Sequence, residues 1–453
     1  MDCMCRWLLL EGVDVIGQPL NRGQGDKLIS KLRHLKTYRL GLLASELARC
    51  LLVSTREINS LDKRFISLIP KRGCRGHVLL CYENKGFFLK PGERMPNDHT
   101  NRWESVQIAQ SFLDLGYQVD VISENNDWFV PVKQYSFFVG NRINFDRIAN
   151  SINGDCVKIL HIDTAHWLFN NSGEHQRLLE LQRRKGITLP TRRSLKPNLA
   201  IEHADYAIIL GNEFTVSTYA YAKKPLFRLP ISSAAFYPLP EDKDFEACRN
   251  HYLWLGGYGL VHKGLDLVLE AFTQMPDYHL TVCGPIDEER DFANAYEKEL
   301  YNTPNIHTVA WIDLESPEFF HISRRCIALI HPSCSEGQSG AVVTCLHAGL
   351  IPIISYESGV DVDGFGVVLK NCSIDAIKNS IRMISSLPAN ELQSRSHKAW
   401  GYSRANHTRE RFAEEYRKGI SAILACLSHT EQTVEERRSH FSQQTTPFSE
   451  TGI

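Results

Sequence analysis

The stretch from His331 to Ser355 constrains the fold more than any other part of the chain. An apolar segment, Cys326–Ile330, leads into it, and the loop that follows opens a helical pattern that ends at Gly349. A second apolar segment, Ile351–Ile354, comes directly after this glycine. This order predicts a strand, a helix and a second strand, which is the βαβ unit from which parallel sheets are built.

The loop before the predicted helix is suited to an anion. It reads Glu336-Gly337-Gln338-Ser339-Gly340, and its glycines let a ligand approach the backbone N–H groups closely. The first turn of the helix adds unpaired N–H groups and the positive end of the helix dipole. Glu336 would repel a phosphate but would accept hydrogen bonds from sugar hydroxyls. The loop therefore suits a sugar joined to a diphosphate, with an ordinary turn between strand and helix as the alternative of equal weight.

The same stretch resembles the C-terminal signature of the GT-B glycosyltransferases, in particular the retaining family 4, or glycosyl transferases group 1, which includes glycogen and sucrose synthases. In that family a second Glu, eight positions after the first, binds the ribose of the nucleotide. Thr344 stands at this position here, and its hydroxyl offers a weaker contact. The residues that match the signature are Pro332, Ser333, Glu336, Gly337, Gly349 and Pro352.

A second segment, Leu253–Asp266, resembles the strand, Gly-Arg turn and Lys-Gly-x-Asp helix start of the same family. Lys263 falls on the lysine that binds the diphosphate, whereas Gly257 replaces the family's arginine. A lysine binds phosphate as a point charge and does not reproduce the two-pronged guanidinium. We expect the backbone N–H groups of Gly256, Gly257 and Gly259 to compensate.

The resemblance also assigns the nucleotide base and the wider fold. The segment Ala310–Asp313 matches the part of the family whose backbone flanks the base, so Trp311 and Ile312 are candidate donor-site residues. The resemblance covers most of residues 72–428, strongly in the C-terminal half and in outline in the N-terminal half. It implies an α/β fold of GT-B type, in which two Rossmann-like, doubly wound domains face a central cleft.

Five parts of the chain follow from this assignment. An extra helical segment forms an N-terminal extension, and the last helix of the core crosses back from the second domain onto the first. A polar tail rich in Ser, Thr, Gln and Glu is expected to be disordered. The parts are the extension (1–71), the acceptor-side domain (72–240), the nucleotide-sugar domain (241–408), the crossover helix (409–428) and the tail (429–453).

The acceptor-side domain has a polar cluster after the predicted strand Val157–Ile162. Ligands of open α/β sheets bind at the carboxyl ends of strands. Members of the family that the chain resembles often place a His at such a strand end, near the transferred sugar. This resemblance makes His166 our first candidate for a residue beside that sugar, and His161 the second. Alternation along the strand places His161 and Asp163 on the same face. A purely structural histidine is the commoner alternative for both.

Composition excludes several classes of protein. Lys and Arg number 51 against 52 Asp and Glu, and the two signs are interspersed, so the chain has no nucleic-acid footprint. The 13 cysteines form no double CxxC motif, which favours reduced thiols in the cytoplasm. No apolar run reaches the roughly 18 residues that span a bilayer. We expect a cytoplasmic protein that is not secreted.

Two basic segments admit two interpretations each. Lys27–Leu52 has the pattern of a basic amphipathic helix or helix pair, which either packs on the N-terminal domain or lies on the inner face of an anionic membrane, where a lipid-linked acceptor is found. Glu174–Pro197 carries seven Lys and Arg residues, and fits a solvated helix face or contact with an anionic acceptor.

The chemistry implied is transfer of a sugar, as by a retaining hexosyltransferase, from a nucleotide-diphosphate sugar to a glycan or lipid-linked glycan acceptor in polysaccharide assembly. Lys263 and the helix that begins at Ser339 would stabilise the leaving diphosphate without a metal or other cofactor. Retention through attack on the leaving-group face requires no carboxylate pair of the hydrolase kind. The alternatives are a non-catalytic GT-B protein that binds nucleotide sugars, which Thr344 and Gly257 favour, and a sugar-nucleotide epimerase.

Overall fold

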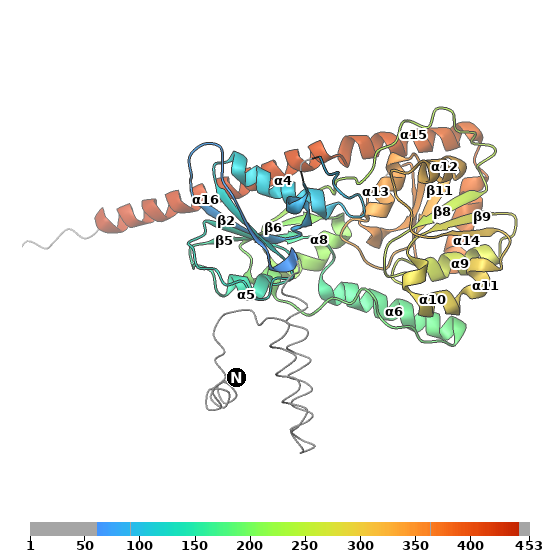
Figure 1. The fold of residues 1–453 in the computed structure, drawn as a ribbon, viewed down its shortest axis with the longest axis horizontal. Coiled ribbons are helices and arrows are strands. Elements are labelled where there is room, and N and C mark those ends of the chain that lie inside the picture. The colour runs from blue at the N-terminus through green and yellow to red at the C-terminus, as the bar shows by residue number, and fades with distance from the viewer. Residues whose placement is uncertain (1–60, 91, 363, 444–453) are drawn as a thin grey trace, which may run out of the picture. The chain divides into compact units, whose positions relative to one another are not determined.

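Two separate sheets organise the part of the chain that the computed structural model describes, which is residues 61–443 without Pro91 and Asp363 (Figure 1). The chain divides into a unit of residues 1–63 and a unit of residues 64–453, and both sheets belong to the second. The predicted basic helix at 27–52 lies outside the described residues, as does most of the predicted helical extension.

The first sheet has seven strands in the order β1-β3-β2-β4-β5-β6-β7. All neighbours pair in parallel except β1, which is antiparallel to β3. The central strands are almost continuously apolar because helices cover both faces of a parallel sheet. The strands are β1 (Phe65–Leu68), β2 (His77–Tyr82), β3 (Gln118–Ser123), β4 (Phe137–Gly140), β5 (Val157–Ile162), β6 (Tyr206–Leu210) and β7 (Leu226–Leu229).

Short helices connect these strands. A long polar loop between β2 and the first helix contains one 3-10 turn, η2 (Lys85–Phe88). We call the first sheet with its helices the first lobe, and the second sheet with its helices the second lobe. The helices of the first lobe are α4 (Asn101–Asp114), α5 (Phe145–Ala149), α7 (Ala200–His203) and α8 (Glu213–Tyr219), with the 3-10 turn η3 (Ala220–Ala222) after α8. Asn212 begins α8 because its side chain accepts a hydrogen bond from the N–H of Phe214.

The second sheet has six parallel strands in the order β10-β9-β8-β11-β12-β13. Because β8 comes first in the chain and has β9 on one side and β11 on the other, the strand order reverses between β8 and β11. In doubly wound sheets this is where a ligand binds. The strands are β8 (His251–Leu255), β9 (His279–Cys283), β10 (Ile306–Val309), β11 (Ala328–His331), β12 (Ile351–Ser355) and β13 (Val367–Leu369).

Helices cover both faces of this second sheet (Figure 1). They are α9 (Leu265–Thr273), α10 (Arg290–Ala295), α11 (Glu297–Tyr301), α12 (Pro317–Arg325), α13 (Gly340–His347), α14 (Ile374–Ser385) and α15 (Ala389–Asn406), with 3-10 turns η4 (Ile286–Glu288) and η5 (Tyr356–Ser358). The last helix, α16 (Arg409–Gln443), returns to the first lobe and packs on α4, β6 and β7, as the predicted crossover helix required.

One helix of the first lobe packs on the second. Helix α6 (Trp167–Lys185) follows β5, yet its residue Leu181 is fully buried in the same apolar cluster as Trp254 of β8. At its C-terminal end Arg184 pairs with Asp266 at 2.5 Å, and Lys185 pairs with Glu299 at 2.7 Å. The helix lies beside α9 and α10 in Figure 1. The basic segment predicted at 174–197 is therefore half helix, and three of its seven basic residues, Arg184, Lys185 and Arg192, form ion pairs with the second lobe.

The structure corrects the predicted boundaries at both ends. Phe65–Leu68, assigned to the helical extension, is strand β1, whose Ser67 Oγ donates to Asp120 on β3 at 2.6 Å. The disordered tail predicted from residue 429 is wrong as far as Gln443, because α16 continues through it. This stretch is rich in Glu, Gln and Arg, which favour helix. Residues 444–453 lie outside the described part.

Candidate functional site

Lys263 and Glu336 meet at the reversal point of the second sheet. Lys263 lies on the turn after β8 and Glu336 on the loop after β11, and these strands are neighbours. The Lys263 Nζ atom lies 2.6 Å from Oε1 of Glu336, and the two residues are only 9% and 8% exposed. The structure thus brings together the two charged residues that the sequence singled out, as a buried ion pair.

Glu336 is held in its charged form by several neighbours. Ser333 Oγ donates to Oε1 at 2.9 Å, and His331 Nε2 lies 3.8 Å from the same oxygen. Burial alone would raise the pKa of Glu336, but the ammonium of Lys263 holds it well below its usual range. Glu336 is therefore an ionised acceptor at neutral pH.

The loop that precedes α13 packs tightly on the first lobe. The carbonyl of Gly337 accepts a hydrogen bond from Thr215 Oγ1 at 2.9 Å, and a Cβ on Gly337 would lie 2.3 Å from the carbonyl oxygen of Asp163. Gln338 Oε1 accepts from the N–H of Ile231 at 2.7 Å. Gly337 and Gln338 therefore join the lobes.

The start of α13 itself remains open. Ser339 is the N-cap, and its Oγ accepts from the N–H of Val342 at 3.5 Å. The same hydroxyl hydrogen-bonds His331 Nε2 at 3.1 Å. A Cβ on Gly340 would meet no atom within 4 Å. The predicted helix start is confirmed, and the space that a Cβ on Gly340 would occupy is free of other atoms.

The turn after β8 contains Gly256, Gly257 and Gly259 and is called the glycine turn below. Its backbone N–H groups already bind a carboxylate. Glu289, which is 2% exposed, accepts hydrogen bonds from the N–H groups of Gly259 and Leu260, the latter at 3.1 Å. Burial raises its pKa, although those N–H bonds and Arg192 act in the opposite direction. Gly256 packs against the ring of Trp254, and Gly257 has no atom within 4 Å of a built Cβ. The Gly259 N–H group, which was expected to compensate for the missing arginine, is thus already hydrogen-bonded to Glu289.

His262 is a neighbour of this turn that the sequence argument missed. It is 1% exposed, its Nε2 hydrogen-bonds the carbonyl of Ser335 at 2.5 Å, and its carbonyl accepts from the N–H of Cys334 at 2.9 Å. Burial lowers the pKa of His262 to about 4, against the opposing charge of Glu336. The neutral ring ties the β8 turn to the β11 loop. Its position beside Lys263 in the sequence was the one available signal.

The two candidate histidines of the first lobe differ in their surroundings. His166 is the N-cap of α6, with Nδ1 accepting from the N–H of Leu168 at 3.4 Å and Nε2 bonded to Tyr221 Oη at 3.1 Å. His161 is buried on β5, and neither ring nitrogen has a partner among the described residues. Burial lowers the pKa of His161 to about 4, with the charge of Asp163 opposing it.

The remaining donor-site candidates divide by exposure. Trp311 is 56% exposed and available to stack on a base, whereas Ile312 is buried. Thr344 lies on α13 with only 2% of its surface exposed, so its hydroxyl has little access to a ribose.

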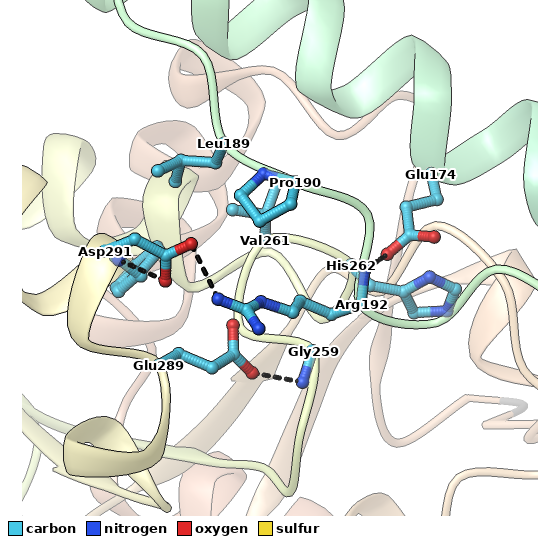
Figure 2. Close-up of a pocket in the computed structure, with 10 residues that line it drawn as sticks. Glu174, Leu189, Pro190, Arg192, Gly259, Val261, His262, Glu289 and Asp291 are labelled. Atoms are coloured by element: carbon cyan, nitrogen blue, oxygen red, sulfur yellow. Dashed lines mark hydrogen bonds and ion pairs between the residues drawn. The ribbon is translucent and has the colours of Figure 1, made fainter. Parts of the chain in front are cut away.

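A small cavity lies between the glycine turn and the segment that follows α6 (Figure 2). Its volume of about 10 Å³ is enough for about one water molecule. Arg192 and Asp291 close one side with an ion pair of 2.6 Å, and Glu174 accepts from the backbone N–H of Arg192 on the other. This cavity is part of the packing between α6 and the second lobe and does not admit a nucleotide.

Two absences concern only the described residues. Within ranges 61–90, 92–362 and 364–443, no group of three or more His, Cys, Asp and Glu side chains is arranged to hold a metal ion. In that same part of the chain, no helix combines the length and apolarity needed to cross a bilayer.

Comparison with known proteins gives a family for one lobe and a fold for the chain. Residues 257–401 match the family of glycosyl transferases group 1. The structure is similar to sucrose-phosphate synthase from Thermosynechococcus elongatus (TM-score 0.54, 12% identity, 78% of this chain and 100% of that one). It is also similar to HepE from Anabaena (TM-score 0.47, 12% identity, 78% and 100%). No curated protein sequence matches the chain. Residues 257–401 therefore form a glycosyl transferases group 1 domain, within a chain that has the two-sheet fold of GT-B glycosyltransferases.

Proposed function

We propose that this chain transfers a sugar from a nucleotide-diphosphate sugar to an acceptor hydroxyl. The observation that carries the proposal is the 2.6 Å pair of Lys263 and Glu336 at the entrance to α13. A cation, an anion and a helix N-terminus converge there at the carboxyl ends of β8 and β11. The cation and the helix would stabilise charge growing on a diphosphate, and the anion would orient sugar hydroxyls.

The ion pair suggests how the two residues divide their work. The hydrogen bonds from Lys263 and Ser333 both go to Oε1 of Glu336, so we assign Oε2 to a sugar hydroxyl. Lys263 would then lie between this carboxylate and the leaving diphosphate, with charge attraction on both sides. Because the pair is preformed and buried, little reorganisation would be needed as the bond to the anomeric carbon breaks.

We extend the proposal to retention, to independence from metals and to the acceptor. Retention is supported by the resemblance of the Glu-Gly loop to retaining transferases. Lys263 and the α13 N-terminus are the positive groups that would replace a metal. We propose a glycan or lipid-linked glycan acceptor in polysaccharide assembly, approached from the cytoplasm, with residues 27–52 on the membrane surface.

A non-catalytic nucleotide-sugar-binding protein is the second candidate, and two observations favour it. Glu289 puts a buried carboxylate on N–H groups of the glycine turn. Thr344, which stands where the family has its ribose-binding Glu, is nearly inaccessible. A protein that retains the fold and loses the chemistry would accumulate such changes at its donor site.

Incubation with a panel of nucleotide sugars and acceptors tests the proposal. Release of nucleotide that depends on an acceptor supports transfer, and Lys263→Met and Glu336→Gln should each abolish it. Lys185→Met is the matched control for charge, because Lys185 pairs with Glu299 on α11. Binding without turnover would replace the proposal with the second candidate. Interconversion of the donor sugar without acceptor would replace it with an epimerase.

A further inference from the structure

The glycine turn lacks a guanidinium at the position where the resembling family has one. Gly257 has no side chain, and the space around a built Cβ there is open. Lys263 is the one positively charged side chain contributed by the turn itself, and it is already paired with Glu336. A diphosphate carries more negative charge than one paired lysine offsets, so a further cation at this turn would be needed to bind it well.

Arg193 lies over this turn. It belongs to the segment after α6, and its Cγ and Cδ atoms are 2.4 and 3.0 Å from the place where a Cβ on Gly259 would lie. Burial raises the pKa of Glu336 and Lys263 lowers it most, and the charge of Arg193 makes a smaller contribution in the same direction as Lys263. It acts on His262 as well. The Arg193 side chain therefore lies against Gly259, and its charge acts on both Glu336 and His262.

The backbone of Arg193 is fixed while its side chain is free. Its N–H donates to Glu174 Oε1 at 2.8 Å, and its carbonyl accepts from Asn170 Nδ2 at 2.8 Å. Glu174 is 2% exposed and also accepts from the N–H of Arg192. By contrast the Arg193 side chain is exposed, and its guanidinium makes no hydrogen bond or ion pair with any described residue. Neighbouring Arg192 instead pairs with Asp291 at 2.6 Å.

The packing of α6 also holds Arg193 against the second lobe. Because α6 packs on the second lobe through Leu181 and Arg184, the segment that follows it stays with the glycine turn. Arg193 therefore keeps its place against Gly259 even though its position in the sequence is in the first half of the chain.

We propose that Arg193 binds the diphosphate of the donor and supplies the guanidinium that Gly257 lacks. This inference rests on the proposed function, because it names a further binding residue of the same donor site. The proposed role is specific to Arg193, because Glu174 holds its backbone in place while its guanidinium is left to bind a ligand.

Titration calorimetry with a panel of nucleoside diphosphates, and with the parent nucleosides, tests the proposal. A charge-assisted, two-pronged contact is lost in Arg193→Gln, so we expect nucleoside diphosphate affinity to fall by about tenfold to a hundredfold. Nucleoside affinity should be unchanged. The matched control is Arg183→Gln, which removes the same charge from an exposed position on α6. Its affinity for nucleoside diphosphates should equal that of the wild type.

A second substitution tests the claim of replacement. Gly257 has an open environment and no positive φ, so Gly257→Arg is sterically allowed. We expect Gly257→Arg in the Arg193→Gln background to restore nucleoside diphosphate affinity to within a few-fold of wild type. A purely structural role for Arg193 predicts no such rescue, together with a lower unfolding temperature for Arg193→Gln.

The outcomes separate this inference from the proposed function. If the wild type binds nucleoside diphosphates and Arg193→Gln binds them equally well, Arg193 has no such role while sugar transfer still stands. If Arg193→Gln lowers the affinity for nucleosides and for nucleoside diphosphates by the same factor, the effect is structural and the inference is overturned. If the wild type neither binds any nucleoside diphosphate nor turns over any nucleotide sugar, both proposals fail.

Discussion

Glu289 accepts a hydrogen bond from the backbone N–H of Gly259, at the turn that would face the diphosphate of a donor. Replacement of a buried carboxylate by a neutral amide keeps an oxygen acceptor and removes a negative charge. We therefore expect Glu289→Gln to bind nucleoside diphosphates several-fold more tightly than wild type, since less repulsion opposes the ligand. Titration calorimetry at constant ionic strength measures this. Weaker binding would mean that Glu289 organises the turn for the ligand.

The buried pair of Lys263 and Glu336 predicts an asymmetric mutational pattern. Lys263→Met leaves Glu336 buried without its cation, which costs about 3–5 kcal/mol of unfolding free energy. Lys263→Met combined with Glu336→Gln removes both charges and should be closer to wild type than the single variant. Urea unfolding at pH 7 provides the measurement. Equal destabilisation by the single and double variants would show that the charges are not coupled.

Acid should weaken the fold through Glu336. Its pKa in the folded state lies below the usual range, so the folded protein binds fewer protons here than the unfolded chain does. The contribution is present above the unfolded Glu pKa of about 4.3 and is lost as pH falls through the folded value. Glu336→Gln should therefore lose less stability than wild type between neutral and acid pH. Parallel pH profiles for the two proteins would contradict this.

Gly337 and Gly340 form a matched pair for testing how closely the lobes must approach. A Cβ on Gly337 would lie 2.3 Å from the Asp163 carbonyl oxygen, whereas a Cβ on Gly340 meets no atom within 4 Å. Gly337→Ala should lower the unfolding temperature and any transfer activity, because two backbone segments would have to move apart. Gly340→Ala should leave the unfolding temperature within a degree or two of wild type. Equal unfolding temperatures would show that the loop shifts freely.

The two histidines of the first lobe should separate stability from activity. His166→Ala removes the cap of α6 and should cost about 0.5–2 kcal/mol of unfolding free energy. His161→Met removes two buried nitrogens that have no partner among the described residues, and should leave stability equal or higher. If His161 contacts the sugar, the same variant loses activity. Chemical unfolding and turnover assays on both variants distinguish these effects.

Strand and helix positions in the C-terminal half were predictable because local patterns determine them. The strand β12 begins at the predicted Ile351, and Ser339 caps α13 where the sequence indicated. The convergence of Lys263 and Glu336 followed from motif and topology together, because adjacent parallel strands bring their following loops to one edge of the sheet.

The elements that sequence reasoning missed depend on contacts between distant residues. Nothing near Glu289 indicates that it turns toward Gly259, which is thirty positions away. The packing of α6 on the second lobe depends on Leu181 joining the apolar cluster that contains Trp254. A helical pattern shows that a helix has an apolar face, but it does not predict which part of the protein that face packs against. Strand β1 was overlooked because it is short and lies at an edge, and only its partner β3 makes it a strand.

Helix α6 has a consequence for the modularity of the molecule. A fragment cut at the boundary near residue 240 would leave the second sheet without Leu181, and Asp266 without Arg184. Such a C-terminal fragment would expose apolar surface that its own residues cannot cover. The two halves are thus joined in their interiors as well as by their linker. Exchange of either half between relatives therefore requires that α6 be kept together with the second sheet.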